Sequence, residues 1–155
     1  MPAAAPVASP RKGGHKVHTS SNRVAGGGEG QGNMPTLVLD NGAYHLKVGF
    51  AGDPAPRLLM PNCTAKLKGQ LQLLVGDDID LVNNTANLQY TRPFDRGYLT
   101  NWEAENQVWK RAFGETNLKV EPEETRLVVT EAPFTPTSLS TFSTQVIFEE
   151  FGFAA

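Results

Sequence analysis

Residues 36–52, "TLVLDNGAYHLKVGFAG", carry the strongest structural signal in the chain. The first five residues form a short, nearly continuous apolar run, which is typical of a buried strand. Asn41-Gly42 follows, and this dipeptide is the strongest short signal for a β-hairpin. Residues 45–50 then alternate, with Leu46, Val48 and Phe50 on one face. The stretch therefore predicts two antiparallel strands that bury one shared face.

The next segments extend this hairpin into a larger sheet. The turn "AGDPAP" precedes "RLLMP", which we expect to be a third strand that ends at Pro61. Residues 62–92 contain short apolar pieces without a long period, so short strands and loops are expected there. Leu127–Thr130, within "ETRLVVTEAP", has the composition of a further buried strand.

Two helices are expected in the second half of the chain. The first begins at "TNWE", where Thr100 and Glu103 have the spacing of a capping box, and it stops at Gly114. Apolar residues recur within it at helical spacing: Trp102, Val108, Trp109, Ala112 and Phe113. The second has Thr135 as N-cap and Pro136 at its first position, and Gly152 ends it. Its apolar stripe comprises Leu139, Phe142, Val146 and Ile147. Hairpin-paired strands followed by helices predict an α/β fold with a mixed β-sheet flanked by helices.

Residues 1–35 differ from this body in composition. They lack Phe, Trp and Tyr and are rich in Gly and Pro, so too little apolar surface exists to offset the chain entropy of folding. Four Lys and Arg residues stand against Glu29 alone. We therefore expect a disordered, basic Gly/Pro-rich tail over 1–35 and a folded part over 36–155. A solvated tail is favoured over a weak nuclear-import patch at "PRKGGHK" or a transit peptide.

Charge and composition exclude several classes of protein. The whole chain has a net charge of −2 and residues 1–35 carry +3, so residues 36–155 carry −5 and are not basic enough to predict nucleic-acid binding. No apolar run approaches the roughly 20 residues of a membrane span. Cys63 is the single cysteine, so no intramolecular disulfide is possible. His15, His18 and His45 have no zinc-site spacing with Cys63. Asp77, Asp78 and Asp80 lack EF-hand spacing, which favours a solvated acidic turn over a calcium site.

The hairpin loop is the one candidate site for chemistry. A tight turn between strands can direct backbone N–H groups at an anion, and Gly42 permits close approach. Lys47 would place an ammonium beside a phosphate, and Asp40 would act on the water shell of Mg²⁺. On these residues alone, a simple hairpin turn without a ligand remains the favoured alternative.

Four separated motifs, in order, resemble the actin superfamily from Thr36 to Ala155: "LVLDNGAYHLKVGFAGDPAPR", "TNWEAENQVW", "PEETRLVVTEAPFTP" and "FEEFGFAA". "PNC", "RPFDRGYLTNW" and "QVWKRAFG" resemble one nuclear branch of its actin-related proteins more than conventional actin. The resemblance implies a partial actin-like (ribonuclease H-like) domain, with residues 36–155 as an N-terminal fragment of truncated subdomains 1 and 2. It also implies that the first phosphate loop comprises Asp40, Asn41, Gly42, Ala43, Tyr44 and Lys47.

Two residues of this loop depart from the family pattern. Conventional actin has a serine where Ala43 stands, so a donor worth roughly 1.5–3 kcal/mol to a charged phosphate is lost. It has a glycine where Tyr44 stands, so backbone approach is more crowded here. The family's second phosphate loop and adenosine pocket are expected beyond Ala155. We therefore predict a vestigial loop, no enzymatic activity, no metal site and no cofactor for this chain, with ATP and Mg²⁺ only in a full-length family member.

The resemblance also implies a function. It predicts a non-catalytic subunit of a nuclear SWR/SRCAP-type chromatin-remodelling complex, which exchanges a variant histone into nucleosomes. The expected partners are protein subunits of that complex, with histones as candidates, and neither nucleic acid directly nor a membrane. The expected location is the nucleus, with the cytoplasm as a second location. The alternatives are an ATP-binding cytoskeletal actin-like protein and a truncated product without independent function.

Overall fold

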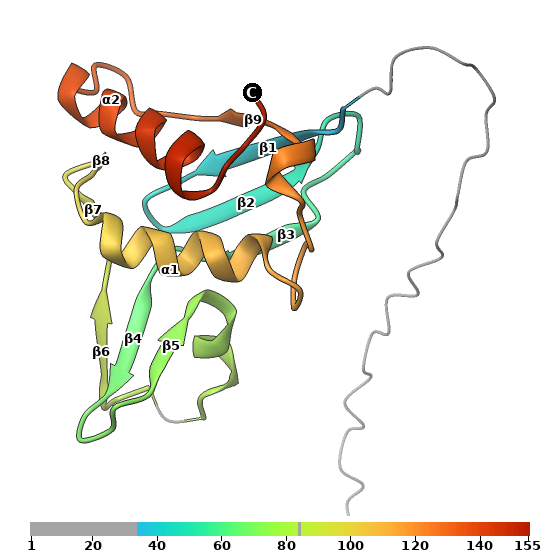
Figure 1. The fold of residues 1–155 in the computed structure, drawn as a ribbon. Helices are drawn as coiled ribbons and strands as arrows, with labels where there is room; N and C mark the ends of the chain where they lie inside the picture. The colour runs from blue at the N-terminus through green and yellow to red at the C-terminus, as the bar shows by residue number, and fades with distance from the viewer. Residues whose placement is uncertain (1–33, 84) are drawn as a thin grey trace, which may run out of the picture. The chain divides into compact units, whose positions relative to one another are not determined.

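A computed structural model describes residues 34–83 and 85–155 (Figure 1). The predicted tail over 1–35 lies outside these residues except for Met34 and Pro35. The main sheet has four strands in the order β3-β2-β1-β9: β1 (Thr36–Asn41), β2 (His45–Phe50), β3 (Leu58–Pro61) and β9 (Arg126–Val129). β1 pairs antiparallel with β2 and parallel with β9, and β2 pairs antiparallel with β3. The predicted mixed sheet is therefore confirmed.

A smaller three-stranded sheet forms from the region predicted to hold short strands. Its order is β5-β4-β6, from β4 (Thr64–Leu67), β5 (Leu73–Val75) and β6 (Leu88–Thr91). The 3-10 helix η1 (Gly76–Leu81) follows β5. A two-stranded ribbon, β7 (Phe94–Asp95) and β8 (Tyr98–Leu99), leads into the first long helix. Cys63, the three-stranded sheet and η1 contribute to a separate apolar cluster, which contains Cys63, Ala65, Leu74, Ile79 and Leu88.

Helix α1 (Trp102–Phe113) begins one residue later than the sequence predicted. Asn101 is the N-cap, and its Oδ1 accepts a hydrogen bond of 3.1 Å from the backbone N–H of Ala104. The predicted capping box of Thr100 and Glu103 is therefore wrong. The Thr100 hydroxyl points back to the Pro93 carbonyl instead, at 3.5 Å, because the β7–β8 ribbon brings that carbonyl within reach. Gly114 follows the last helical residue, as predicted, but with extended backbone.

The final helical segment also starts one residue later than predicted. Pro136, not Thr135, is the N-cap of α2 (Thr137–Gln145), while the Thr135 hydroxyl donates to the Ala132 carbonyl at 2.7 Å. The segment continues as a π-helix, η3 (Val146–Glu150), and Gly152 follows with a positive φ of 73°. A short 3-10 turn, η2 (Pro122–Glu124), precedes β9. Of the predicted apolar stripe, Val146 and Ile147 are buried, whereas Phe142 stays 45% exposed.

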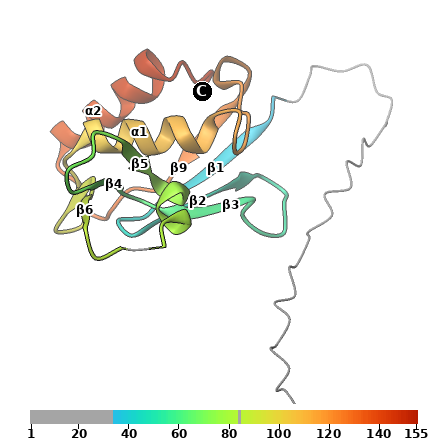
Figure 2. The same ribbon diagram turned by 90° about the horizontal axis from the view of Figure 1, so that it is seen from below.

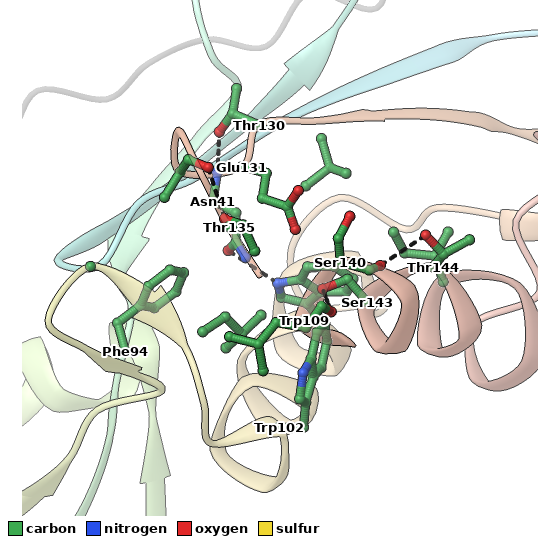
Figure 3. A pocket seen from close by; sticks show the side chains of 16 residues that line it. Asn41, Phe94, Trp102, Trp109, Thr130, Glu131, Thr135, Ser140, Ser143 and Thr144 are labelled. Atoms are coloured by element: carbon green, nitrogen blue, oxygen red, sulfur yellow. Dashed lines mark hydrogen bonds between the residues drawn. The ribbon is translucent and has the colours of Figure 1, made fainter. Parts of the chain in front are cut away.

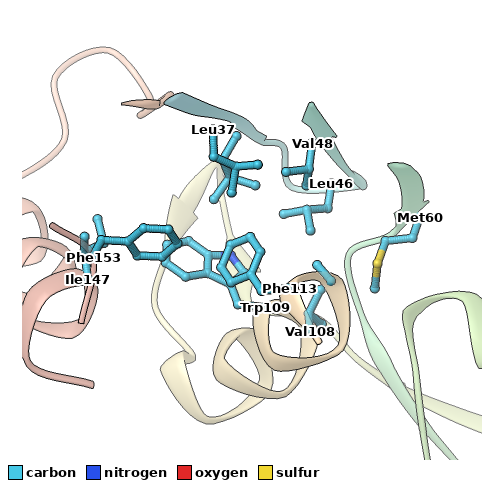
Figure 4. Close-up of a cluster of buried hydrophobic side chains, with 11 residues drawn as sticks. Leu37, Leu46, Val48, Met60, Val108, Trp109, Phe113, Ile147 and Phe153 are labelled. Atoms are coloured by element: carbon cyan, nitrogen blue, oxygen red, sulfur yellow. The ribbon is translucent and has the colours of Figure 1, made fainter. Parts of the chain in front are cut away.

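The core lies between one face of the main sheet and the two helical segments, which cover the same side (Figures 2 and 4). Leu46 and Val48 on β2 are fully buried, as the alternation of residues 45–50 predicted, and Leu37 and Leu39 on β1 are fully buried beside them. Strand β3 adds Met60, and the elements packed on this face supply Val108, Trp109, Ala112, Phe113, Ile147 and Phe153. The rings pack edge to face, with the centroids of Phe113 and Phe153 5.5 Å apart. The opposite sheet face carries Asp40 and Lys47, so the core also fixes where the hairpin points.

Candidate functional site

Asp40 and Lys47 are brought together by the register of the first hairpin. They are directly paired across β1 and β2, and Lys47 Nζ lies 2.8 Å from Asp40 Oδ2. This hydrogen bond from Lys47 is the main reason that the pKa of Asp40 is lowered from its usual value. Both side chains are about half exposed, so the pair is screened by water and contributes little to folding stability. The ion pair with Asp40 occupies the ammonium group of Lys47, which the sequence predicted would lie beside a phosphate.

Thr130, which the sequence did not single out, completes this end of the sheet. Its hydroxyl accepts a hydrogen bond from the backbone N–H of Asn41 and donates one to Asp40 Oδ1, both at 3.1 Å. Its backbone N–H donates to the Leu39 carbonyl at 3.0 Å. The parallel pairing of Leu39 with Val129 places Thr130, the residue that follows β9, beside Asp40. A signal existed in the sequence: the carboxyl ends of neighbouring parallel strands meet at one edge of a sheet.

The loop itself differs from the turn that Asn41-Gly42 predicted. Asn41 is still in β1, and Gly42 is not among the residues with positive φ, so this is not a turn built on a left-handed Asn-Gly pair. Gly42 is required for another reason. A Cβ at this position would lie 2.7 Å from the His45 carbonyl oxygen, closer than real Cβ contacts. Ala43 and Tyr44 form the exposed tip, where the Arg92 guanidinium lies 4.1 Å from the centre of the Tyr44 ring.

A buried polar network supports the loop from the core side. Asn62 Nδ2 donates to the Gly42 carbonyl at 3.0 Å and to Glu105 Oε1 at 3.4 Å. Trp109 Nε1 donates to the same Glu105 oxygen at 2.9 Å and lies 3.4 Å from Asn41 Oδ1. Asn62 and Glu105 are both fully buried. The network therefore ties α1 to Asn41 and Gly42, at the start of the loop.

Burial is the dominant influence on Glu105. It raises the pKa of this carboxyl from 4.5 to about 7, against the opposing hydrogen bonds from Asn41, Asn62 and Trp109. Glu105 Oε2 and Asn62 Oδ1 have no hydrogen-bond partner within the described part of the chain. The sequence offered one sign of this carboxyl: Glu105 lies three residues after Trp102 and four before Trp109, on the buried stripe of the helix.

A cavity of about 140 Å³ opens beside this network (Figure 3). The end of β9, helices α1 and α2 and the β7–β8 ribbon enclose it. Its aromatic lining comes from Phe94, Trp102 and Trp109, and its polar lining includes Thr130, Glu131 and Ser143. The rings of Trp102 and Trp109 meet edge to face, with centroids 5.7 Å apart. The spacing of seven residues predicted that these two tryptophans share a helix face, with core packing as the default and a partner groove as the alternative. It did not reveal the cavity beside them.

The acidic turn is not simply solvated. Arg111 Nε lies 3.0 Å from Asp77 Oδ1, and its Nη2 lies 2.8 Å from Asp78 Oδ1, so η1 is pinned to α1. The hydrogen bond to Arg111 lowers the pKa of Asp77.

Cys63 is buried, and burial raises the pKa of its thiol. Among residues 34–83 and 85–155, no group of three His, Cys, Asp or Glu side chains is placed to hold a metal. No helix in these ranges is long and apolar enough to cross a membrane.

Comparisons with known proteins agree with this fold. The family model described as actin matches residues 31–155. The chain is 42% identical to the actin-like protein ARP6 of Cryptococcus neoformans over 120 residues, which cover 77% of this chain and 24% of that protein. It is 39% identical to the actin-related protein 6 of Neurospora crassa, covering 77% and 28%, and 38% identical to that of Oryza sativa, covering 79% and 28%.

These relatives are longer than the chain, which spans about a quarter of their length. The four motifs quoted from residues 36–155 lie inside the matched region, and the mixed sheet with its helices is the part of an actin fold that those motifs implied. The chain belongs to the actin family, and within that family it is similar to the N-terminal portion of actin-related protein 6.

Proposed function

We propose that this chain acts as a non-catalytic actin-related protein in a nuclear SWR/SRCAP-type chromatin-remodelling complex, which exchanges a variant histone into nucleosomes. The similarity to actin-related protein 6 in fungi and plants carries the proposal. Such a subunit works through protein contacts, so its partners are other subunits, with histones as candidates. The acidic balance of the chain, with a net charge of −2, argues against direct contact with nucleic acid. The nucleus is the proposed location, and the cytoplasm a second one.

The side chains of the loop support a role without catalysis. The Lys47 ammonium is already engaged by Asp40 at 2.8 Å. Ala43 offers no hydroxyl to a phosphate, and Tyr44 occupies the loop tip under Arg92. Thr130 uses its hydroxyl on Asp40 and on the backbone of Asn41. These residues fit a bound phosphate poorly, and we assign the chain no cofactor.

The proposed assembly is tested by affinity purification of the tagged 155-residue chain from nuclear extract, with quantification of remodelling-complex subunits. A scrambled sequence of the same composition is the control. We expect the subunits of one complex to be enriched together. Recovery no greater than with the scrambled chain would exclude the proposal.

The absence of a cofactor is tested separately by isothermal titration with Mg-ATP. We expect no heat of specific binding. A dissociation constant near or below about 1 µM, equivalent to about −8 kcal/mol, would contradict the proposal. If heat is observed, Lys47→Ala shows whether the loop is responsible, because this substitution removes the only ammonium paired across the hairpin.

A further inference from the structure

The cavity beside α1 has a lining that suits one kind of side chain. Phe94, Trp102 and Trp109 give it aromatic walls from the β7–β8 ribbon and α1 (Figure 3). Its volume of about 140 Å³ accommodates a side chain or a small group rather than a nucleotide. Aromatic faces are electron-rich and attract cations that lie within about 6 Å of the ring centre. The walls alone therefore favour either an apolar or a cationic occupant.

The polar lining distinguishes between these two. Glu131 contributes a carboxylate at the end of β9, and none of the residues that line the cavity is Lys, Arg or His. Several of the hydroxyl groups that line the cavity already donate their hydrogen bond to another group of the chain. Thr130 donates to Asp40 Oδ1, Ser143 to the Leu139 carbonyl and Thr144 to the Ser140 carbonyl. What these oxygens still offer is acceptor lone pairs. The cavity thus combines negative charge, hydroxyl acceptors and aromatic rings, which complement a cation that carries several donors.

We propose that this cavity binds an arginine side chain of a protein partner. A guanidinium is planar, stacks on aromatic rings and presents five N–H donors in a fixed fork, so it can face Glu131 and the hydroxyl oxygens while it lies against a tryptophan. A lysine ammonium is compact and strongly hydrated, and it cannot stack in this way. The inference goes beyond the proposed function, because it assigns a contact site by its chemistry and holds for any partner that supplies the arginine.

Binding in this cavity can be measured by the intrinsic tryptophan fluorescence of the chain. Its two tryptophans, Trp102 and Trp109, both line the cavity, so intrinsic fluorescence is specific for it. We expect a saturable fluorescence change when the 155-residue chain is titrated with the capped peptide Gly-Gly-Arg-Gly-Gly. The matched peptide with Lys in place of Arg should bind more weakly, and the one with Gln should produce no saturable change. No saturable change with the Arg peptide would overturn the proposal, and equal binding of the Lys peptide would overturn its choice of arginine.

Two variants locate the binding. Glu131→Gln removes the carboxylate and should weaken binding of the Arg peptide about tenfold. Ser143→Leu should abolish it, because the larger side chain fills the cavity from α2. The controls Glu149→Gln and Ser138→Leu change exposed residues outside the lining and should bind as the parent does. Thermal melts establish that each variant folds. Unchanged affinity of a folded Glu131→Gln variant for the Arg peptide would refute the site. That result would not affect the proposed function, which the recovery of remodelling subunits tests separately.

Discussion

Glu105 makes the stability of this domain depend on pH in an unusual direction. Its carboxyl has a pKa of about 7 in the folded chain and 4.5 ordinarily. Between these values the folded state holds a proton that the unfolded state has lost, so the free energy of unfolding falls as pH rises from about 4.5 to 7. At about 1.4 kcal/mol for each pH unit, the loss amounts to roughly 3 kcal/mol. Urea denaturation at several pH values measures this slope.

Glu105→Gln should remove that slope and leave the variant more stable than the parent at pH 8, because a neutral amide carries no penalty for buried charge. Glu103→Gln is the matched control on the same helix, since Glu103 is exposed. Asp40 and Asp77 do not interfere, because their lowered pKa values place their effects at lower pH and with the opposite sign. A parent and a Glu105→Gln variant with the same slope over this window would show that Glu105 does not titrate as described.

Glycine is required at position 42 because the backbone there lies close to the His45 carbonyl group. Gly42→Ala places a methyl group 2.7 Å from the His45 carbonyl oxygen, so the loop must shift away from Asn62 or the strands must separate. We expect a loss of about 1–3 kcal/mol in the free energy of unfolding. Ala43→Ser, at the exposed loop tip next to it, should change stability by less than about 0.5 kcal/mol. Equal effects of the two substitutions in urea denaturation would argue against the close contact.

At the level of elements, the start of α1 depends on Asn101 rather than on Thr100. Asn101→Ala leaves the N–H of Ala104 without its acceptor and should cost about 1 kcal/mol. Thr100→Ala removes only a 3.5 Å contact with the Pro93 carbonyl and should cost less. Thermal or urea denaturation of the two single variants ranks them. The reverse order would restore Thr100 as the N-cap, as the local sequence pattern alone predicted.

For the whole molecule, local patterns were sufficient for the strands and the helix stripe but not for the links between them. The alternation of residues 45–50 identified the buried face correctly, because strand periodicity is a property of adjacent residues. Both helices start one residue later than predicted, because the hydroxyls of Thr100 and Thr135 donate hydrogen bonds to carbonyls earlier in the chain and do not cap the helices. The contacts of Glu105 with Asn62 and of Thr130 with Asp40 join residues 43 and 90 positions apart. No local periodicity predicts such pairs, and they are the ones that shape the candidate site.

The face of the main sheet opposite the core leads to the last prediction. Val38, Leu59 and Val128 share this face and are 38%, 63% and 52% exposed, and the long helical segments pack on the other face of the sheet. Apolar surface of this kind favours association, so the 155-residue chain should self-associate with rising concentration in sedimentation velocity experiments. Replacing both Leu59 and Val128 with Thr keeps the strand preference and the net charge while reducing the apolar area, and should shift the chain toward monomer. Leu71→Thr is the control, since Leu71 is fully exposed in the β4–β5 loop away from this sheet. If the double variant associates as strongly as the parent and the Leu71→Thr control, this face is not the surface through which the copies meet.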